Sequence, residues 1–289
     1  MQKRKGIVLA GGDGSRLYPS TASISKQIIP IYDKPMIYYS LSTLMLAGIK
    51  DILIISTPYD IPSFEKLFGD GSSFGINICY EIQPEPKGIA QAFLIGEDFL
   101  SGSESCLTLG DNIFYGVGLQ KLLRNANQSN GVSTIFTYIV NDPTRFGVVE
   151  NDKFGNILSI EEKPKIPKSN YAVTGLYFYD NNASNYTKNL VPSKRGELEI
   201  TDLNNIYLEN NNLKEVKLSK GYAWFDTGTP ESLLDASNFI YAIEKRQGSK
   251  ICCPEEIALN NKWIGCEDIQ RIIHRKSNPY NNYLASLCE

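Results

Sequence analysis

Histidine is nearly absent from this sequence of 289 residues, which contains only His274. A metal site built from several histidine ligands is therefore excluded, and a Ser-His-Asp triad has a single candidate base, near the C-terminus. The sequence also lacks the Asp-x-Asp motif that is the common metal motif of glycosyltransferases. These absences weaken most hydrolase hypotheses and the glycosyltransferase hypothesis.

Long hydrophobic runs are missing as well. The apolar, uncharged segment Pro35 to Ile49 has only 15 residues, whereas a membrane-spanning helix needs about 20 apolar residues. The apolar stretch Gly6 to Ala10 follows a basic start but meets Asp13 and Arg16 at once, unlike the core of a signal peptide. We expect a soluble protein without a membrane partner.

Cysteines at metal-binding spacing are also absent. No two of the six have the C-x-x-C spacing of a zinc or redox site, and several lie within apolar runs. So few cysteines in so long a chain predict reduced, buried thiols, no disulfide framework and a cytoplasmic location. The six are Cys79, Cys106, Cys252, Cys253, Cys266 and Cys288.

Basic charge is not in excess. The chain has 29 Lys and Arg against 32 Asp and Glu, a net charge of −3, and its isoelectric point is about 5.5. A nucleic-acid groove needs excess Lys and Arg to displace counterions, so the composition predicts no nucleic-acid partner and favours a small-molecule ligand. Hydrophobic residues make up 42% of the chain, which is enough for one large domain or two unequal lobes.

Short β-branched runs alternate with helical patterns in the first part of the chain. This alternation is typical of βαβ units and predicts an α/β fold with a doubly wound, mostly parallel sheet. The predicted strands cover 6–10, 52–56, 76–82 and 106–109, and the predicted helices cover 35–48, 63–68, 89–100 and 118–126. In the first of these helices, Pro35 would form the first turn and Gly48 would end the helix.

From residue 132 the pattern changes to strands joined by turns, which indicates an inserted β-rich lobe. Predicted strands cover 132–140, 147–150, 157–161 and 172–179, followed by a helix over 200–208 and a strand over 213–218. The segment 221–226 would then return the chain to the sheet, before a long helix that begins at Thr229-Pro230. We expect one domain over residues 1–250 and a helical appendage over 251–289.

A glycine-rich turn, Gly11 to Arg16, follows the first predicted strand. Leu17 stands where the G-x-G-x-x-G fingerprint needs its third glycine, and no G-K-S/T follows, so neither common nucleotide motif is present. Glycines still let backbone N–H groups approach phosphate oxygens, and the Arg16 fork can hold two of them. The alternative is an ordinary tight turn with a surface arginine.

Further charged residues can join this turn. Lys26 lies ten residues after Arg16 and supplies a second cation. Asp111 and Asp226 each follow a predicted strand, so both could lie at the carboxyl ends of a parallel sheet and together hold Mg²⁺. Taken singly, Asp111 could instead cap a helix and Asp226 could lie in a surface turn.

Gln83 is the candidate for recognising a base. Its amide can form two hydrogen bonds with thymine, and Gly88 in the same loop would let the backbone come close. Uracil shows the same hydrogen-bonding edge, so these residues do not distinguish dTTP from UTP as the substrate. Trp224 is assigned to the core rather than to a ligand contact.

The turn followed by Pro19, Lys26 and Pro30 resembles the signature of sugar-nucleotide pyrophosphorylases, the nucleotidyltransferases that join an NTP to a sugar 1-phosphate. Further blocks occur in the family's order along nearly the whole chain and are similar to those of glucose-1-phosphate thymidylyltransferases. These blocks are Leu109–Asn112, Phe146–Glu150, Glu161–Pro164, Val173–Gly175, Gly196–Asp202 and Trp224–Thr229.

This resemblance implies a Rossmann-like nucleotidyltransferase fold, with a nucleotide half at about 1–131 and a sugar-binding portion at about 132–228. It implies an enzyme that converts dTTP and glucose 1-phosphate to dTDP-glucose and pyrophosphate, the first step of deoxysugar biosynthesis of the rhamnose type. It further implies Mg²⁺ as cofactor and a homotetramer with contacts through the C-terminal helices. The alternatives are the same chemistry with UTP or another hexose 1-phosphate, and a non-catalytic sugar-nucleotide sensor.

The resemblance also implies roles for individual residues. Arg16, Lys26 and Lys163 would be catalytic, and Asp111 and Asp226 would bind the metal ion. The sugar phosphate would be bound by Phe146, Gly147, Glu162, Lys163 and Val173. The nucleotide would be bound by Leu9, Gly11, Gly12, Gly14, Ser15, Arg16, Gln27, Gln83, Gly88 and Asp111.

The implied mechanism needs no protein base. A phosphate monoester loses its second proton with a pKa near 6, so the attacking phosphate oxygen is already ionised at neutral pH. The difficulty is to bring two polyanions together, and the fixed cations and Mg²⁺ would neutralise and align them for in-line attack on the α-phosphorus.

Some positions depart from the family pattern. Ser15 stands where threonine is usual and keeps the hydroxyl, whereas Phe146 stands where tyrosine is usual, so one polar contact to the sugar would be missing. Val117-Gly118 replaces His-Asp, and Lys220 replaces a common arginine, at positions that resemble the family's second, regulatory nucleotide site. We therefore predict that end-product feedback does not act here in its usual form.

Overall fold

The computed structural model describes residues 4–12, 14–273 and 278–289. Its centre is a nine-stranded sheet in the order β10-β9-β11-β6-β1-β4-β5, with β8 paired to β11 and β12 paired to β8. The four parallel strands β6-β1-β4-β5 come from the first part of the chain, as the β-branched runs predict. Their bounds are Lys5–Ala10 (β1), Asp51–Ser56 (β4), Asn77–Ile82 (β5) and Ser105–Leu109 (β6).

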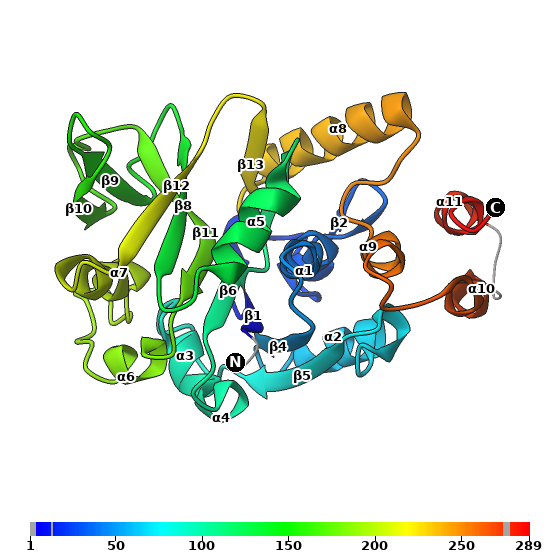
Figure 1. Ribbon diagram of the computed structural model, residues 1–289, viewed down its shortest axis with the longest axis horizontal. Helices are drawn as coiled ribbons and strands as arrows, with labels where there is room; N and C mark the ends of the chain where they lie inside the picture. The colour runs from blue at the N-terminus through cyan, green and yellow to red at the C-terminus, as the bar shows by residue number, and fades with distance from the viewer. Residues whose placement is uncertain (1–3, 13, 274–277) are drawn as a thin grey trace.

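Helices cover both faces of this sheet, which confirms the expected α/β fold (Figure 1). Successive residues of a strand point to opposite faces, so Ile7 and Val8 of β1 belong to two separate hydrophobic clusters. The Val8 face is covered by α1 (Ile37–Leu46), α2 (Ile61–Phe68) and α5 (Leu119–Gln128). The Ile7 face is covered by α3 (Gln91–Ile95), α4 (Glu97–Leu100), α6 (Ala183–Thr187) and α7 (Ile200–Glu209).

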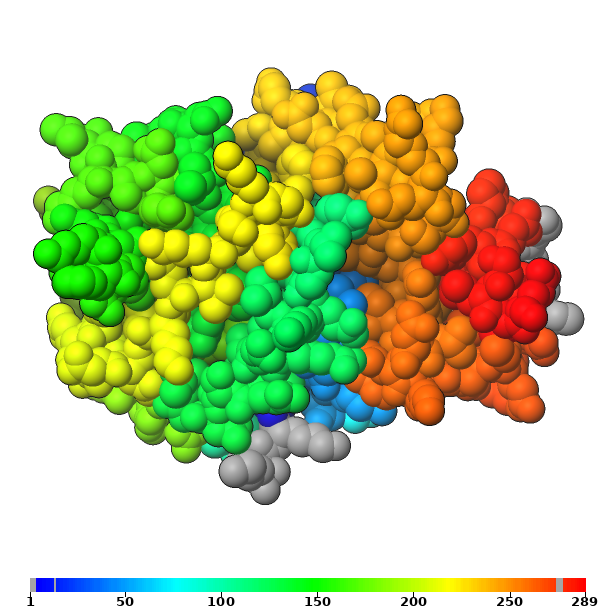
Figure 2. Space-filling view, turned by 45° about the horizontal axis from the view of Figure 1, so that its top comes forward, coloured from blue at the N-terminus to red at the C-terminus, as the bar shows by residue number. Residues whose placement is uncertain are grey.

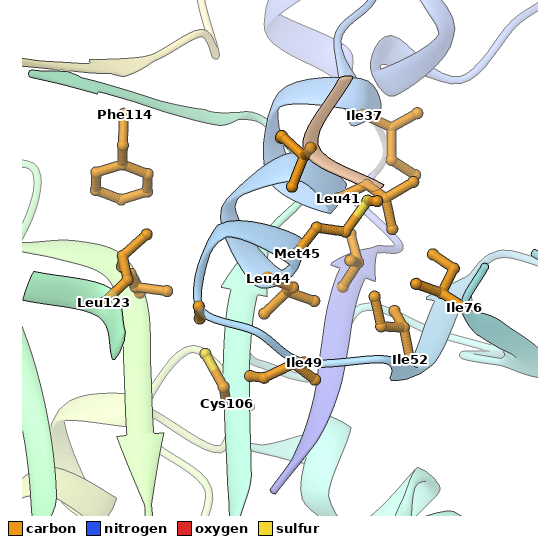
Figure 3. Packing of buried hydrophobic residues seen from close by; sticks show 14 of the residues in the cluster. Ile37, Leu41, Leu44, Met45, Ile49, Ile52, Ile76, Cys106, Phe114 and Leu123 are labelled. Carbon is orange, nitrogen blue, oxygen red and sulfur yellow. The ribbon is translucent and has the colours of Figure 1, made fainter. Parts of the chain in front are cut away.

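Helix α1 packs a stripe of apolar side chains against the sheet. Ile37, Leu41, Leu44 and Met45 are fully buried, and Figure 3 shows them above Ile52 of the sheet. The helix begins at Ile37, two residues later than predicted. Pro35 belongs instead to β3 (Lys34–Pro35), which forms a short antiparallel pair with β2 (Pro30–Ile31).

The predicted helix over 89–100 is divided into α3 and α4. Gly96 separates the two, and a Cβ atom there would lie 3.0 Å from the Ala92 carbonyl and 3.1 Å from Leu53 of the sheet. The glycine therefore allows this face of the helical segment to approach β4 closely.

The strands of the β-rich portion extend the same sheet. Strand β11 (Tyr171–Tyr179) pairs antiparallel with β6, and through β11 the remaining strands join the sheet. They are β8 (Ser133–Ile139), β9 (Gly147–Asn151), β10 (Ile157–Glu162) and β12 (Leu213–Leu218). The predicted strands are thus present, and they share one sheet with the first part of the chain.

The predicted return of the chain to the main sheet at residues 221–226 is wrong. Strand β13 (Tyr222–Asp226) pairs only with β7 (Asn112–Gly116), in a separate antiparallel ribbon. Strand β6 already has β1 and β11 as neighbours, so β13 cannot pair with β6, and it pairs instead with β7, which directly follows β6 in the chain. The chain therefore leaves the sheet after β6 and builds β7 outside it.

The C-terminal part is helical, as expected. It comprises α8 (Pro230–Gln247), α9 (Pro254–Asn260), α10 (Cys266–Ile273) and α11 (Pro279–Ser286). Thr229 caps α8 as predicted, in a reciprocal capping box with Ser232. Figure 2 shows the last helices, in orange and red, at one end of the molecule, with the β-rich portion, in green and yellow, at the other.

The prediction of reduced, buried cysteines is wrong for three of the six, and a fourth, Cys252, is only half-buried. Cys266 and Cys288 form a disulfide, because α10 and α11 pack together and bring their Cα atoms to 5.7 Å. Cys79 is exposed on β5, at the edge of the sheet. His274 lies outside the described residues. Within the described part of the chain, no helix has the length and apolar character that a membrane span needs.

Candidate active site

Two adjoining cavities lie at the carboxyl ends of the parallel strands. The first, the glycine-loop cavity, has a volume of about 300 Å³ and lies beside the loops that follow β1, β5 and β6. The second, the sugar-side cavity, has a volume of about 430 Å³ and lies between those loops and the β-rich portion. Arg16, Asp111, Ile89, Leu109 and Glu197 line both.

The sequence-predicted residues gather around these two cavities. Leu9, Gly11, Gly12, Lys26, Gln27, Gln83 and Gly88 line the glycine-loop cavity. Phe146, Gly147, Glu162, Lys163, Val173 and Asp226 line the sugar-side cavity. Gly14 and Ser15 are predicted nucleotide contacts that line neither cavity in the described part of the chain.

Arg16 lies at the boundary between the cavities. It belongs to the short 3-10 helix η1 (Ser15–Leu17), which Gly14 opens in the left-handed conformation with φ of 64°. The Arg16 guanidinium lies against Gly228, where a Cβ atom would be 2.5 Å from Nη2. A side chain at position 228 would therefore displace the arginine.

Lys26 faces the first cavity from η2 (Lys26–Ile28). Ser25 caps this helix and donates a hydrogen bond to Gln27 Oε1 at 2.6 Å, which fixes the buried Gln27. The Lys26 ammonium forms an ion pair with Asp111. The two predicted cations Arg16 and Lys26 thus share one pocket, together with a carboxylate.

The pKa values of Asp111 and Asp226 shift in opposite directions because their surroundings differ. Burial disfavours the charged form of Asp111, but Lys26 and the Asn112 amide outweigh this, so the pKa of Asp111 lies below its ordinary value. Burial and then the charge of Asp111 raise the pKa of Asp226, against the opposing effects of Lys26 and Arg16. The two carboxylates are therefore close enough to repel each other.

These two aspartates fit a metal ion that takes few protein ligands. No group of three or more His, Cys, Asp or Glu side chains within the described residues could hold a metal ion. Mg²⁺ usually takes one or two carboxylates and completes its coordination with water and substrate phosphates. Two carboxylates beside a cavity suit that pattern.

Gln83 is held by its neighbours. Its side-chain amide donates to Gln91 Oε1 at 2.8 Å, and its backbone N–H donates to the Ser56 carbonyl at 2.7 Å. Its Oε1 lies over Gly11, where a Cβ atom would be only 2.0 Å away. Gly11 thus makes room for the glutamine side chain.

The closest neighbour of Gly88 is another segment of the protein, which fills space that a base would need on this side of the glycine. Gly88 has φ of 101°, and a Cβ atom there would lie 2.3 Å from the Leu198 carbonyl oxygen. Leu198 donates its N–H to Lys87 and accepts from Ala90, so its backbone fills this side of the glycine. The loop at 83–88 and the segment before α7 are therefore joined.

Glu162 organises the sugar-side cavity. Its carboxylate accepts a hydrogen bond from Thr201 Oγ1 at 2.6 Å and forms ion pairs with Arg195 at 3.4 Å and Lys163 at 3.6 Å. Lys163 has a positive φ of 44°, and its N–H donates to the Phe146 carbonyl at 3.0 Å. The backbone at this turn is fixed, while the Lys163 ammonium stays accessible with 44% of its side chain exposed.

Trp224 is buried, as predicted, and it also forms part of the cavity wall. Its ring packs against Phe146 with 5.1 Å between centroids, and its indole N–H donates to Asn112 Oδ1 at 2.6 Å. The prediction of a core role is confirmed by this packing.

Sequence reasoning missed two arginines. Arg195 lines the sugar-side cavity and pairs with Glu162, Glu197 and Glu199, which together raise its pKa despite the opposing effect of burial. Arg145 lines the same cavity and lies 3.6 Å from Asp226. Arg145 directly precedes the family-like block Phe146–Glu150, and Arg195 directly precedes the block Gly196–Asp202. In the sequence, only this position beside a block points to a role for either arginine.

Comparisons with known proteins find relatives along nearly the whole chain. A model of the nucleotidyl transferase family matches residues 5–242. The glucose-1-phosphate thymidylyltransferase of Xanthomonas campestris pv. campestris is 56% identical to this chain, and the match covers all of this chain and 98% of that protein. The glucose-1-phosphate thymidylyltransferase of Neisseria gonorrhoeae is 54% identical, and the match covers 98% of this chain and 99% of that protein. A 2.76 Å crystal structure of a Bacillus anthracis protein in complex with sucrose is 42% identical, with a TM-score of 0.75 over 82% of this chain and 94% of that one.

Proposed function

This chain belongs to the nucleotidyl transferase family, among its glucose-1-phosphate thymidylyltransferases, and from that premise we propose how its residues bring two substrates together. The enzyme joins dTTP and glucose 1-phosphate to give dTDP-glucose and pyrophosphate. The observation that carries the residue assignment is the pair of adjoining cavities, which share Arg16 and Asp111.

The nucleotide occupies the glycine-loop cavity in this proposal. The backbone of the Gly11–Arg16 turn and the Arg16 guanidinium hold the phosphates, and Lys26 neutralises part of their charge. The Gln83 amide faces the base, oriented by Gln91. Thymine and uracil show the same edge to a glutamine, and one methyl group is worth about 1–3 kcal/mol, so the choice of dTTP is supported by the likeness to the relatives above.

Glucose 1-phosphate occupies the sugar-side cavity. The Lys163 ammonium binds the phosphate, and the Glu162 carboxylate accepts hydrogen bonds from sugar hydroxyls. The backbone of Gly147 and Val173 supplies further hydrogen bonds, and Phe146 provides an apolar wall. The support for these roles is that all five residues line one cavity.

The reaction is an in-line displacement at the α-phosphorus of dTTP. A phosphate oxygen of the sugar phosphate forms the new P–O bond while the bond to pyrophosphate breaks. The nucleophile is already ionised at neutral pH, so no side chain needs to remove a proton. The protein's contribution is alignment and charge neutralisation by Arg16, Lys26 and Lys163.

Nucleotidyltransferases generally use a divalent metal ion. We assign Mg²⁺ as that ion, with Asp111 and Asp226 as its protein ligands. When bound, it would neutralise charge on the phosphates that complete its coordination. Lys26 would then share Asp111 with the metal ion, because the two are already paired.

A substrate panel tests the proposed reaction. Pyrophosphate release is measured with dTTP, UTP, ATP and GTP, each combined with the 1-phosphates of glucose, galactose and mannose. We expect the highest kcat/KM for dTTP with glucose 1-phosphate. Higher kcat/KM for UTP or for another hexose would change the substrates but not the chemistry, and no turnover with any pair would reject the enzyme assignment.

A homotetramer in the cytoplasm completes the proposal, with residues 251–289 as the contact-forming appendage. Its support is the family likeness and the position of the last helices at one end of the molecule (Figure 2). Light scattering coupled to size-exclusion chromatography checks it. A mass near four times 32.3 kDa is expected, and a monomer would contradict the tetramer.

A further inference from the structure

The two aspartates assigned to the metal ion are carried by the β7–β13 ribbon and the residue that precedes it. Asp226 is the last residue of β13 and pairs with Asn112, the first residue of β7, which directly follows Asp111. Neighbouring carboxylates repel each other, and the repulsion is stronger where water is excluded. The fold must therefore supply contacts that keep the two together.

Thr227 supplies one such contact. It directly follows Asp226 and is fully buried, with 0% of its surface exposed. Its backbone N–H donates to the Asp111 carbonyl at 3.1 Å, and its Oγ1 donates to the same carbonyl at 2.7 Å. One residue thus ties the segment of Asp226 to the backbone of Asp111 by two hydrogen bonds.

Asn112 supplies the second contact. Its Nδ2 donates to Asp111 Oδ1 at 3.0 Å, while its Oδ1 accepts from the Trp224 indole at 2.6 Å and from the Gly175 N–H at 3.1 Å. A Cβ atom at Gly175 would lie 2.7 Å from Asn112 Oδ1, so a glycine at this position allows the approach. The amide therefore links Asp111 to β13 and β11.

The Asp111 carboxylate is then held at both oxygens. Oδ1 accepts from Asn112, and Oδ2 faces the Lys26 ammonium. The orientation of this side chain is determined before any ligand binds. Within the described residues, no side-chain amide donates to Asp226; its carboxylate lies 3.6 Å from Arg145, and its backbone is held by the ribbon and by Thr227.

We propose that Thr227 and Asn112 are positioning residues that hold Asp111 and Asp226 at the separation needed to share one divalent cation. The proposal rests on the proposed function, because it takes these aspartates as the metal ligands. Thr227 lines neither cavity, so its effect reaches the reaction only through the aspartates, whereas Asn112 also lines the sugar-side cavity.

The test replaces Thr227 with valine and with serine. Valine has nearly the same shape and keeps the backbone N–H, but it lacks the hydroxyl donor, whereas serine keeps that donor. Mn²⁺ binding to the enzyme saturated with dTDP-glucose is measured from the electron paramagnetic resonance signal of free Mn²⁺, against dTDP-glucose alone. Thr187→Val is the matched control, since Thr187 is equally buried and its hydroxyl donates to a carbonyl in α6, outside both cavities.

We expect Thr227→Val to weaken Mn²⁺ binding at least about tenfold, as is typical when a residue that orients a metal ligand is lost. The kcat of this variant should fall, while its KM for glucose 1-phosphate stays within about twofold of the wild-type value. Thr227→Ser should restore both values to within about threefold of wild type, and Thr187→Val should leave them unchanged. Asn112→Ser, which removes the amide donor to Asp111, provides the second variant if Thr227→Val does not fold. Because Asn112 also lines the sugar-side cavity, the readout for this variant is Mn²⁺ binding at saturating dTDP-glucose.

Wild-type Mn²⁺ binding and kcat in both Thr227→Val and Asn112→Ser would overturn the positioning proposal. Asp226→Asn distinguishes this failure from failure of the metal assignment. If Asp226→Asn loses Mn²⁺ binding while the two positioning variants keep it, only the positioning proposal is wrong. If Asp226→Asn binds Mn²⁺ as wild type does, the metal assignment is wrong and the positioning proposal falls with it.

Discussion

In the proposed function, single charged side chains at the two cavities decide which substrate each cavity holds. Lys163 is on the sugar side, Lys26 is on the glycine-loop side, and Arg16 lies at the boundary. Two of these cations have a carboxylate nearby: Glu162 lies beside Lys163, and Asp111 lies beside Lys26. This separation predicts different kinetic effects for the three residues.

Lys163→Met should act mainly on glucose 1-phosphate. The change keeps the length of the side chain and removes its charge, so a charge-assisted hydrogen bond to the sugar phosphate is lost. We expect the KM for glucose 1-phosphate to rise about tenfold or more, with a much smaller rise in the KM for dTTP. Initial rates over a matrix of both substrate concentrations measure the two values.

Lys165→Met is the matched control, because Lys165 is an exposed lysine two residues further along that lines neither cavity. It should leave both KM values unchanged. Equal increases in both KM values for Lys163→Met would contradict the assignment of Lys163 to the sugar phosphate.

At the residue scale, the sequence predicted which residue types form the site and which of them lie together, but it predicted few of the contacts between individual residues. The shared pocket of Arg16 and Lys26 follows from their closeness in the chain and from the loop at the end of β1. The approach of Leu198 to Gly88 was not predictable, because it joins segments more than 100 positions apart. The contact of Arg195 with Glu162 was not predictable either, because the two residues come from different elements and meet only in the folded chain.

At the scale of elements, the period of the apolar residues and the positions of the glycines predicted most strands and helices, but not which strands pair with each other. Residues 222–226 have the composition of a buried strand, and nothing in that composition shows whether the strand joins the main sheet or β7. The fold decides the pairing: β6 already has β1 and β11 as neighbours, and β13 pairs with β7, which directly follows β6. The division of the helix at 89–100 likewise depends on the distance to β4, which only the fold determines.

Helix α9 carries a carboxylate whose burial should make stability depend on pH. Glu255 is in the first turn and is 4% exposed, and Tyr280 donates a hydrogen bond to it at 2.8 Å. Burial raises the pKa of Glu255 despite these hydrogen bonds. The folded state therefore binds this proton more tightly than the unfolded state, so stability is highest below the unfolded pKa and falls as pH rises toward the folded pKa.

Glu255→Gln should remove this dependence. We expect the variant to be more stable than wild type at pH 8, by on the order of 1 kcal/mol, and to match it more closely at pH 4. Urea unfolding at a series of pH values measures the difference. Glu267→Gln, a change at an exposed carboxylate of α10, is the control, and a wild-type pH profile for Glu255→Gln would contradict the prediction.

The Cys266–Cys288 disulfide should stabilise α10 and α11 locally. A cross-link of this kind commonly contributes about 2–4 kcal/mol, and here it joins two short helices at one end of the molecule. Cys266→Ser should therefore speed amide hydrogen exchange in residues 266–273 and 279–286 while leaving kcat unchanged. Cys79→Ser, at an exposed free cysteine, should alter neither.

Hydrogen exchange followed by mass spectrometry checks this under non-reducing conditions. Unchanged exchange in both helices of Cys266→Ser would show that packing alone holds them. Faster exchange throughout the main sheet would show that the disulfide has a global effect instead of a local one.

At the scale of the whole molecule, the departures at Val117, Gly118 and Lys220 predict altered regulation. Val117 is 92% exposed between β7 and α5 and offers no polar side-chain atom to a ligand. We expect dTDP-rhamnose to inhibit only by competing with dTTP. Inhibition kinetics at several dTTP concentrations measure this, and inhibition that saturating dTTP does not relieve would contradict it.

The whole account depends on the fixed cations that let two polyanions meet, and Arg16 is the cation that both cavities share. The most direct measurement is the kcat of Arg16→Ala with dTTP and glucose 1-phosphate, alongside its circular dichroism spectrum and urea midpoint. The account predicts a loss of at least about a hundredfold in kcat with the spectrum and the midpoint close to wild type. Wild-type turnover by a correctly folded Arg16→Ala enzyme would contradict it.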